Sequence, residues 1–258
     1  IVGMVCIAHV IRYFTFSRIP ELEKEHKEQG SNGSFKAAIA CVFRIQGFGT
    51  FNSYVLLITL FTAAVPLVYG LMQKDVFGFS PAQIQFMGTL FLAGSIAGNL
   101  IGGRLVDRWG TRSVFMLSHV SLAVLILVMF ARYWVPLPLM VQVGLCTFLF
   151  SVLEAVKGIA ITSEILELIP ARNKSLSTAV CMALFSVGVA ASQLFVSRSI
   201  SWEILAPEWT LLGKTFSAYD SLLLGFSLML IVLLATLGLV PRVIKKVQLM
   251  PGSGYPRI

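Results

Sequence analysis

The sequence Gly98-Asn-Leu-Ile-Gly-Gly-Arg-Leu-Val-Asp-Arg-Trp-Gly-Thr-Arg112 joins two long apolar runs, at about 82–106 and 113–131. A helix that crosses the hydrocarbon core of a bilayer needs about 20 mostly apolar residues. Both runs reach roughly that length, and the charged residues of the stretch lie where the runs meet. The sequence therefore predicts two membrane-spanning helices with a short polar turn between them.

Similar apolar runs occupy most of the remaining chain, at about 48–72, 137–162, 176–198 and 217–240, and a shorter one opens it at 1–16. These runs are too long for β-strands, so their length favours helices. We predict an all-α polytopic membrane bundle with six spanning helices in residues 48–240, preceded by part of another helix. Pro66 is predicted to kink the first of the six.

The composition supports a membrane protein. Apolar residues make up 57% of the 258 residues and charged residues 12%, whereas a soluble domain usually carries about 25% charged residues. The net charge of +8 is distributed between the apolar runs, which favours a lipid bilayer over nucleic acid as the partner. The four cysteines have no CxxC or Cys/His spacing, so neither a zinc site nor any other cofactor is predicted.

Lysine and arginine are concentrated in alternate loops, and positively charged loops stay on the cytoplasmic side of a membrane. This bias predicts that the linker at 17–47 and the tail at 241–258 are cytoplasmic, in an inner membrane of bacterial type. The richer set of loops holds Arg18, Lys24, Lys27, Lys36, Arg44, Arg104, Arg108, Arg112, Arg172, Lys174, Arg242, Lys245, Lys246 and Arg257, and the poorer set holds Lys74, Arg132, Arg198 and Lys214.

The linker contains a highly charged segment, residues 21–29, and a glycine- and serine-rich break, residues 30–34. This is the composition of a solvated chain. Apolar residues then recur at helical spacing between Phe35 and Phe43. They indicate either a short helix on the inner membrane surface or an early start of the next spanning helix, and both interpretations stay open.

Local signals mark two helix starts and one helix end. Ser80-Pro81-Ala82-Gln83 has the form of a capping box with proline at the first helical position. Asp220 is predicted to cap the last helix, and Pro241 is predicted to end it.

The residue types around the first polar turn favour close helix packing and a tight turn. Gly94, Gly98 and Gly102 lie four apart on one helix face, where small residues let another helix approach closely. Gly110 permits a tight turn between antiparallel helices. Asp107 is a single acid among arginines, and there it can face the positive N-terminal end of a helix or pair with an arginine.

This turn resembles the signature G-x-x-x-D-R/K-x-G-x-R/K between helices 8 and 9 of major facilitator superfamily (MFS) transporters. Its positions are occupied here by Gly103, Asp107, Arg108, Gly110 and Arg112. Ser113 stands where the family often has a second basic residue. The resemblance implies that these residues form a cytoplasmic latch, which helps to hold one of the alternating conformations in that family.

The same resemblance implies the six-helix C-terminal domain of a twelve-helix transporter. Residues 1–16 would then be the end of helix 6, and residues 48–240 would be helices 7 to 12. Because Ile1 lies inside an apolar run, we expect that an N-terminal half is missing from the sequence.

A second patch resembles the acidic residue, proline and arginine that sugar-porter-like members carry after helix 10. It consists here of Glu164, Pro170 and Arg172. The spacing from Glu164 to Pro170 is longer than in sugar porters, so the resemblance supports the superfamily and not a sugar substrate. We hypothesise that Glu164 pairs with Arg108 or Arg112 when the cytoplasmic side is closed, with Glu167 as a competing partner.

Ionisable residues within membrane spans are candidates for function. Glu154 and Lys157 share a helix face and can pair. Glu154 is either a proton-carrying or solute-facing carboxylate, or half of a structural pair whose Lys157 extends to the headgroups. The resemblance adds Asn52 and Tyr54 of helix 7 as candidates for the solute pathway, with interhelical hydrogen bonding as their alternative role. His119 is interpreted as a packed histidine.

The leading hypothesis is secondary active transport of a small solute by alternating access, with the solute bound between two six-helix bundles. Protons or another ion are candidate coupling partners, and the sequence leaves the solute and the direction open. A transporter-like sensor or scaffold without transport activity is the alternative. A membrane-bound enzyme is not favoured, because the sequence has no metal cluster, nucleophile elbow or phosphate loop.

Overall fold

A computed structural model describes residues 48–168 and 174–238 of the chain. The predicted opening helix at 1–16, the linker at 17–47 and the tail at 241–258 lie outside the described residues. So does Arg172.

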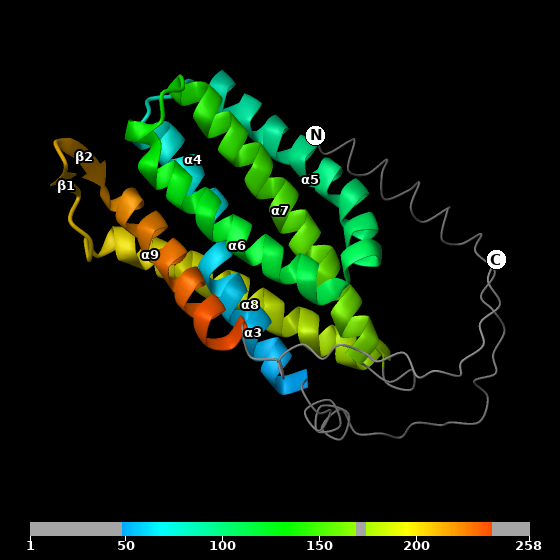
Figure 1. Ribbon diagram of the computed structural model, residues 1–258. Coiled ribbons are helices and arrows are strands. Elements are labelled where there is room, and N and C mark those ends of the chain that lie inside the picture. Colours follow the sequence, from blue (N-terminus) through cyan, green and yellow to red (C-terminus); the bar gives the residue numbers. More distant parts are fainter. Residues whose placement is uncertain (1–47, 169–173, 239–258) are drawn as a thin grey trace, which may run out of the picture. The chain divides into compact units, whose positions relative to one another are not determined.

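The described elements follow one another as helices with a single short hairpin (Figure 1). In chain order they are α3 (Phe48–Thr62), α4 (Val65–Asp75), α5 (Pro81–Trp109), α6 (Thr111–Phe130), the 3-10 helix η1 (Ala131–Trp134), α7 (Leu139–Leu168), α8 (Lys174–Ser201), β1 (Glu208–Leu211), β2 (Lys214–Ser217), α9 (Ala218–Leu233) and the π-helical turn η3 (Leu234–Gly238).

Six helical segments of the described residues are long and apolar enough to cross a membrane. They are Phe48–Asp75, Pro81–Trp109, Thr111–Trp134, Leu139–Glu167, Thr178–Ser201 and Ala218–Thr236. These segments match the six predicted runs in order, which confirms their number and their helical character. Their ends differ from the prediction at one important place. The polar turn expected between the runs at 82–106 and 113–131 is almost entirely helical, because α5 continues to Trp109 and α6 begins at Thr111.

The first span is divided into α3 and α4, which confirms the kink predicted at Pro66. Ala63 and Ala64 separate the two helices, and Pro66 lies in the first turn of α4. A proline has no N–H to donate and clashes with the carbonyl four residues before it, so it interrupts a continuous helix.

The start predicted for α5 is confirmed, whereas the N-cap of α9 is Ser217, and Asp220, which was predicted as the cap, is the third residue of the helix. At the start of α5, the Ser80 N–H donates to Oε1 of Gln83 (2.8 Å), and the Gln83 N–H donates to the Ser80 hydroxyl (3.4 Å). At the start of α9, the N–H and the hydroxyl of Ser217 both donate to Oδ2 of Asp220, at 2.8 Å each. Pro241, the predicted end of that helix, lies outside the described residues.

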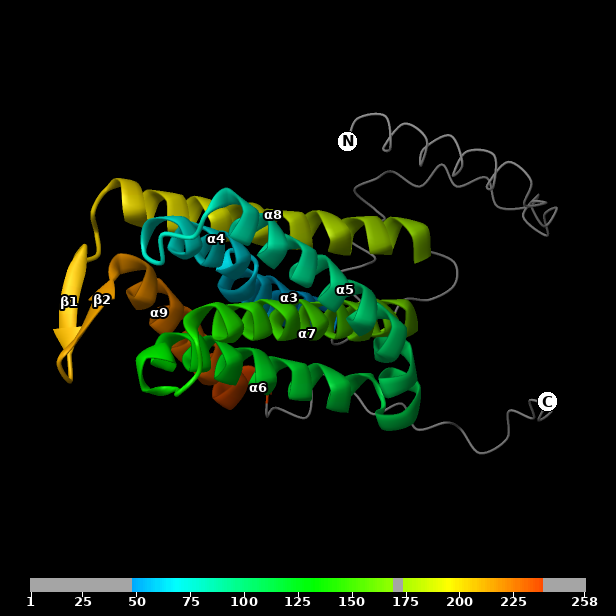
Figure 2. The ribbon, with the colours of Figure 1, turned by 90° about the horizontal axis from the view of Figure 1, so that it is seen from above.

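The spanning helices run alternately in opposite directions, so the bundle has two ends (Figure 2). We call them the hairpin end, which holds β1 and β2, and the signature end, which holds the α5–α6 turn. Helix α7 packs on both α5 and α6, while α9 packs on α6, α3 and α4. Helix α8 packs mainly on α3.

Helices α5 and α7 approach each other closely on the predicted glycine face. Gly94, Gly98 and Gly102 are the buried glycines of α5. A methyl group added at Gly98 would lie 2.5 Å from the carbonyl oxygen of Val152 on α7. The absence of side chains on this face therefore brings the two backbones together, as the four-residue spacing predicted.

Helices α5 and α8 are the least buried of the six spans. Large apolar side chains are exposed along both helices, including Leu92 and Leu100 on α5 and Val187 and Leu194 on α8. Such surfaces are stable in contact with lipid or with further helices, not with water.

The sequence interpretation missed the β-hairpin at the hairpin end. Strands β1 and β2 pair antiparallel, with Trp209 opposite Phe216. Leu212 and Gly213 form the turn, and both have positive φ angles, 50° and 73°. Positive φ angles at both central residues are characteristic of a type I′ turn, whose twist suits a two-residue hairpin. Phe216 is buried and stacks on Phe130 and Trp209, at 4.8 and 4.9 Å between ring centroids.

Candidate functional site

The signature turn is made by a single residue, Gly110, between two long helices. Its φ angle of 78° and ψ angle of 154° are a backbone conformation that only glycine adopts without strain. Its N–H donates to the Val106 carbonyl (2.8 Å) and so closes the last turn of α5. The predicted tight turn at Gly110 is therefore confirmed, and it fixes where the flanking charged residues lie.

The other signature residues lie on the last turns of α5 and the first turn of α6. Asp107 and Arg108 are exposed, and Arg112 is half-buried. Gly103 has no atom within 4 Å of the position that a Cβ would take. The signature end therefore presents charges of both signs on a helical surface.

Glu164 reaches the signature turn from the last part of α7. The Thr111 hydroxyl donates to its Oε2 at 2.6 Å, and the Glu164 side chain is buried. Thr111 is the first residue of α6, where the leading N–H groups lack partners within the helix and carry a partial positive charge. No acidic residue occurs in the first turn of α6. Glu164 thus supplies the negative charge that this helix start lacks.

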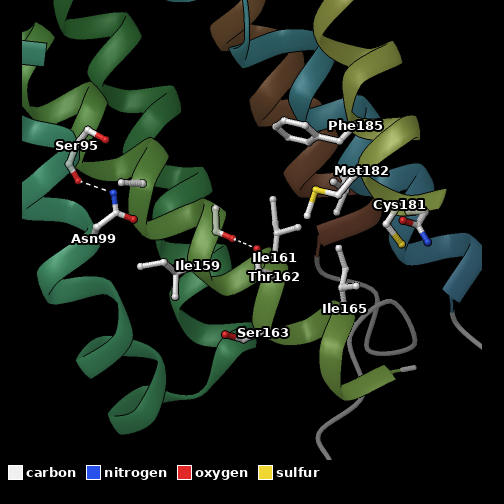
Figure 3. A pocket seen from close by; sticks show the side chains of 14 residues that line it. Ser95, Asn99, Ile159, Ile161, Thr162, Ser163, Ile165, Cys181, Met182 and Phe185 are labelled. Atoms are coloured by element: carbon white, nitrogen blue, oxygen red, sulfur yellow. Dashed lines mark hydrogen bonds between the residues drawn. The ribbon is translucent and has the colours of Figure 1, made fainter. Parts of the chain in front are cut away.

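A pocket of about 460 Å³ lies between α5 and α7 on one side and α3 and α8 on the other (Figure 3). Its lining is largely apolar, with a few amide, hydroxyl and thiol groups. The lining residues are Asn52, Val55, Ser95, Asn99, Ala155, Gly158, Ile159, Ile161, Thr162, Ser163, Ile165, Cys181, Met182 and Phe185. Small-molecule sites are commonly apolar concavities with a few placed polar groups.

Three polar side chains of the pocket donate to backbone carbonyls four residues earlier on their own helices. The Asn99 side chain donates to the Ser95 carbonyl at 2.9 Å, the Thr162 hydroxyl donates to the Gly158 carbonyl at 2.9 Å, and Asn52 donates to the Phe48 carbonyl at 3.0 Å (Figure 3 draws the first two). Their oxygens keep lone pairs that can accept from a solute. The pocket therefore combines an apolar surface with hydrogen-bond acceptors, and among the described residues that line it none carries a carboxylate, ammonium or guanidinium group.

A charged pair lies on α7, beside the interruption of the first span. Lys157 Nζ is 2.6 Å from Glu154 Oε1, and it donates to the Thr62 hydroxyl at 2.8 Å. The Lys157 side chain is 3% exposed and that of Glu154 is 26% exposed. The pair is thus asymmetric, with a buried ammonium and a carboxylate that is partly accessible.

A buried hydrogen-bonded group joins three helices near this pair. The Tyr54 hydroxyl of α3 meets Nδ1 of His119 on α6, and Nε2 of His119 meets the Leu230 carbonyl of α9 (2.8 Å). A carbonyl can only accept, so Nε2 carries the ring proton and Nδ1 accepts from Tyr54. His119 is fully buried. Its role in the structure is to hold helices together, as the packed-histidine interpretation expected.

The sequence model of the Major Facilitator Superfamily matches residues 47–249. The chain belongs to the major facilitator superfamily. The matched residues include the signature turn, the pocket and the charged pair. No curated protein and no solved structure matches the chain. This MFS protein is therefore an integral membrane protein of the transporter type, with a helical bundle of six spans in its described residues.

The structure brings some of the predicted MFS site residues together and separates others. Asn52 lines the pocket. Tyr54 lies two residues away, but it is fully buried, contacts His119 and forms a T-shaped ring pair with Phe115. Glu164 contacts Thr111, and its pairing with Arg108 or Arg112 on closure of the cytoplasmic side stays a prediction.

Two outcomes concern charges. Lys157 is buried between α7 and α3, which does not fit the interpretation that it extends to the headgroups. Within residues 48–168 and 174–238, two ion pairs form, and the pair Arg132–Asp220 was not predicted. In the same residues, no group of three or more His, Cys, Asp or Glu side chains could hold a metal ion.

Sequence reasoning did not connect Thr62 and Ser192 with the interrupted first span of this MFS protein. Thr62 receives the hydrogen bond from Lys157, and the Ser192 hydroxyl of α8 accepts from the Ala64 N–H at 3.1 Å. The available signal was the proline four residues after Thr62. A proline frees the carbonyl four positions before it, so polar side chains from other helices are expected near that place.

We predict that Tyr54→Phe lowers the free energy of unfolding of this MFS protein by about 1–3 kcal/mol, because it leaves Nδ1 of a buried imidazole without a partner. The measurement is unfolding by titration with sodium dodecyl sulfate in mixed micelles. Tyr219→Phe is the matched control, since the Tyr219 hydroxyl donates to Asp75 at an exposed position (2.7 Å). Equal losses in the two variants would contradict the assigned role of Tyr54.

Proposed function

We propose that this protein carries out secondary active transport of a small solute by alternating access. The observation that carries the proposal is the pocket between α5/α7 and α3/α8, in a chain that belongs to a family of transporters. Its apolar lining and scattered hydrogen-bond acceptors suit a solute that has both apolar and polar parts.

The bundle forms one wall of the pathway in this proposal, and a second six-helix bundle forms the other. Two facing bundles are the usual arrangement for transporters that rock around a central site. The exposed apolar faces of α5 and α8 support this arrangement, because both helices also contribute to the pocket. The second bundle is either an additional segment of the same protein or a second copy of the chain.

The signature end lies in the cytoplasm in this proposal, as the distribution of lysine and arginine favours. There the signature residues act as a latch. Asp107 and Arg108 are exposed and are free to meet a second bundle when the two approach. Glu164 stabilises the start of α6 through Thr111 and so keeps the turn in place.

The charged pair on α7 is the candidate for coupling to a proton or another ion. The side chain of Glu154 is 26% exposed, so the described residues of the bundle do not enclose its carboxylate completely. Ionisable residues inside membrane spans commonly mark such pathways.

The function is tested by flux into proteoliposomes that contain the complete protein. The probes are ethidium, radiolabelled lactate and radiolabelled glucose, which represent an amphipathic cation, an organic anion and a sugar. Saturable accumulation of one probe above that of empty liposomes is the expected result. Stable insertion without flux of any probe in either direction, with or without a pH gradient, would favour a sensor or scaffold.

For a probe that is transported, we predict that Asp107→Asn lowers the initial rate at least about fivefold. This is the lower end of the effect expected from the 1–3 kcal/mol that typically separates coupled conformations. Arg104→Gln is the control, because Arg104 is exposed on the same helix but occupies no signature position. An unchanged rate in the Asp107 variant would remove the latch from the proposal.

A further inference from the structure

The interruption between α3 and α4 leaves backbone groups without helical partners. Pro66 has no N–H, so the Thr62 carbonyl loses the donor that a continuous helix would provide. The backbone bonds on either side are intact: Ala63 donates to Thr59 (2.9 Å), and Val68 donates to Ala64 (3.0 Å). The interruption, which we call the α3–α4 junction, is therefore confined to residues 62–66.

Two other helices contact the α3–α4 junction through polar side chains. From α8, the Ser192 hydroxyl accepts the Ala64 N–H at 3.1 Å. From α7, Lys157 donates to the Thr62 hydroxyl at 2.8 Å. Ser192, Lys157 and Thr62 are all buried. The α3–α4 junction is thus hydrogen-bonded to both α7 and α8.

Lys157 is electrostatically suited to its place. Thr62 is the last residue of α3, and the unpaired carbonyls at a helix C-terminus carry a partial negative charge that favours a nearby cation. An ammonium has three N–H groups, of which one reaches Glu154 and another reaches Thr62. Lys157 therefore links the end of α3 to its own helix.

Glu154 reduces the free-energy cost of burying the Lys157 ammonium. An unpaired charge inside a protein is strongly unfavourable, whereas a paired and hydrogen-bonded one is retained. Glu154 lies three residues before Lys157 on the same helix face and is the more accessible of the two. It pairs with Lys157, which in turn donates to Thr62 at the junction.

We propose that Lys157 is a positioning residue that clamps the α3–α4 junction, so that α4 keeps its direction relative to α3 while the Lys157–Thr62 contact is intact. The clamp places α4 relative to α7 at the hairpin end of the bundle, and this role goes beyond the proposed transport function. Loss of the clamp releases α4 to adopt more than one direction.

The test is a distance measurement between spin labels in the complete protein, reconstituted in nanodiscs. Lys74→Cys at the exposed end of α4 and Met140→Cys near the exposed start of α7 carry the labels. The native cysteines are first replaced by serine or alanine. One narrow distance population is expected for the parent and for Lys157→Arg. Lys157→Met is expected to show a second population or a clearly broadened one.

Thr62→Val provides an independent test, because it removes the acceptor and leaves the Glu154–Lys157 pair in place. It is expected to broaden the same distance distribution, and it keeps the proposal falsifiable if Lys157→Met does not fold. Ser227→Ala is the control, since the buried Ser227 hydroxyl donates to the Ala123 carbonyl (2.9 Å) away from the junction. Its distribution is expected to stay narrow.

The proposal is overturned if folded Lys157→Met and Thr62→Val both keep the single narrow population. It is also overturned if Ser227→Ala broadens the distribution as much as they do, because the loss of any buried hydrogen bond would then explain the effect. The readout does not depend on flux, so a failure here is distinct from a failure of the transport proposal.

Discussion

Asp220→Asn is expected to lower the free energy of unfolding by about 3–5 kcal/mol, because it leaves the guanidinium of Arg132 buried and without a charged partner. The side chains of Arg132 and Asp220 are 2% and 0% exposed. Nη1 of Arg132 contacts Oδ1 of Asp220, and Nη2 donates to Oδ2 at 3.1 Å. This two-point geometry is the strongest form of an arginine–carboxylate contact.

The size of the expected loss follows from what surrounds the pair. Oδ2 of Asp220 also accepts from the N–H and the hydroxyl of Ser217 at the start of α9. The Arg132 guanidinium lies 5.2 Å from the centre of the Phe77 ring and 4.4 Å from that of Tyr133. One carboxylate thus ties η1 and the segment after α4 to the hairpin and α9. Its neutralisation weakens several contacts at the hairpin end together.

The measurement is denaturation in mixed micelles, followed by far-ultraviolet circular dichroism. Arg198→Gln is the control, because Arg198 is an exposed arginine stacked on Trp202 at 5.1 Å near the same end. Its loss is expected to stay below about 1 kcal/mol, as for most exposed charges. If Asp220→Asn lowered the free energy of unfolding by no more than Arg198→Gln does, the buried pair would contribute no more than a surface contact.

The spans and their local starts could be predicted because their signals are contained in the sequence itself. A run of about 20 apolar residues fixes a spanning helix without knowledge of its neighbours. The Ser80–Gln83 and Ser217–Asp220 contacts join residues three apart, and such local contacts follow from residue type and spacing. The turn at Gly110 could be predicted in the same way, since a one-residue turn between helices requires a backbone conformation that favours glycine.

Contacts between distant residues could not be predicted in this way. Arg132 was counted as a loop arginine and Asp220 as a helix cap, and nothing in either local segment indicates that they pair. The position of Lys157 depends on the interrupted helix that lies opposite, and sequence alone left the membrane surface as an alternative. The hairpin was missed because its strands have four residues each and its turn, Leu212-Gly213, lacks the usual Asn-Gly or Asp-Gly signal.

Gly98→Ala is expected to destabilise the protein by about 1–3 kcal/mol, the usual effect of overpacking a well-filled interior. The added Cβ would lie 2.5 Å from the Val152 carbonyl oxygen, 2.8 Å from the Ala155 Cβ and 3.0 Å from the Val152 Cα. Two of these atoms are backbone and the third is the Cβ of an alanine. No flexible side chain can therefore move aside, and α5 and α7 must separate.

Gly103→Ala is the matched control on the same helix, because no atom lies within 4 Å of its added Cβ. Alanine is also about 1 kcal/mol more favourable than glycine within a helix, so this variant is expected to be neutral or slightly more stable. The measurement is the thermal unfolding midpoint of both variants in one detergent. Equal midpoints would mean that α5 and α7 can separate without cost, and the pocket that they share with α3 and α8 would then not be a fixed cavity.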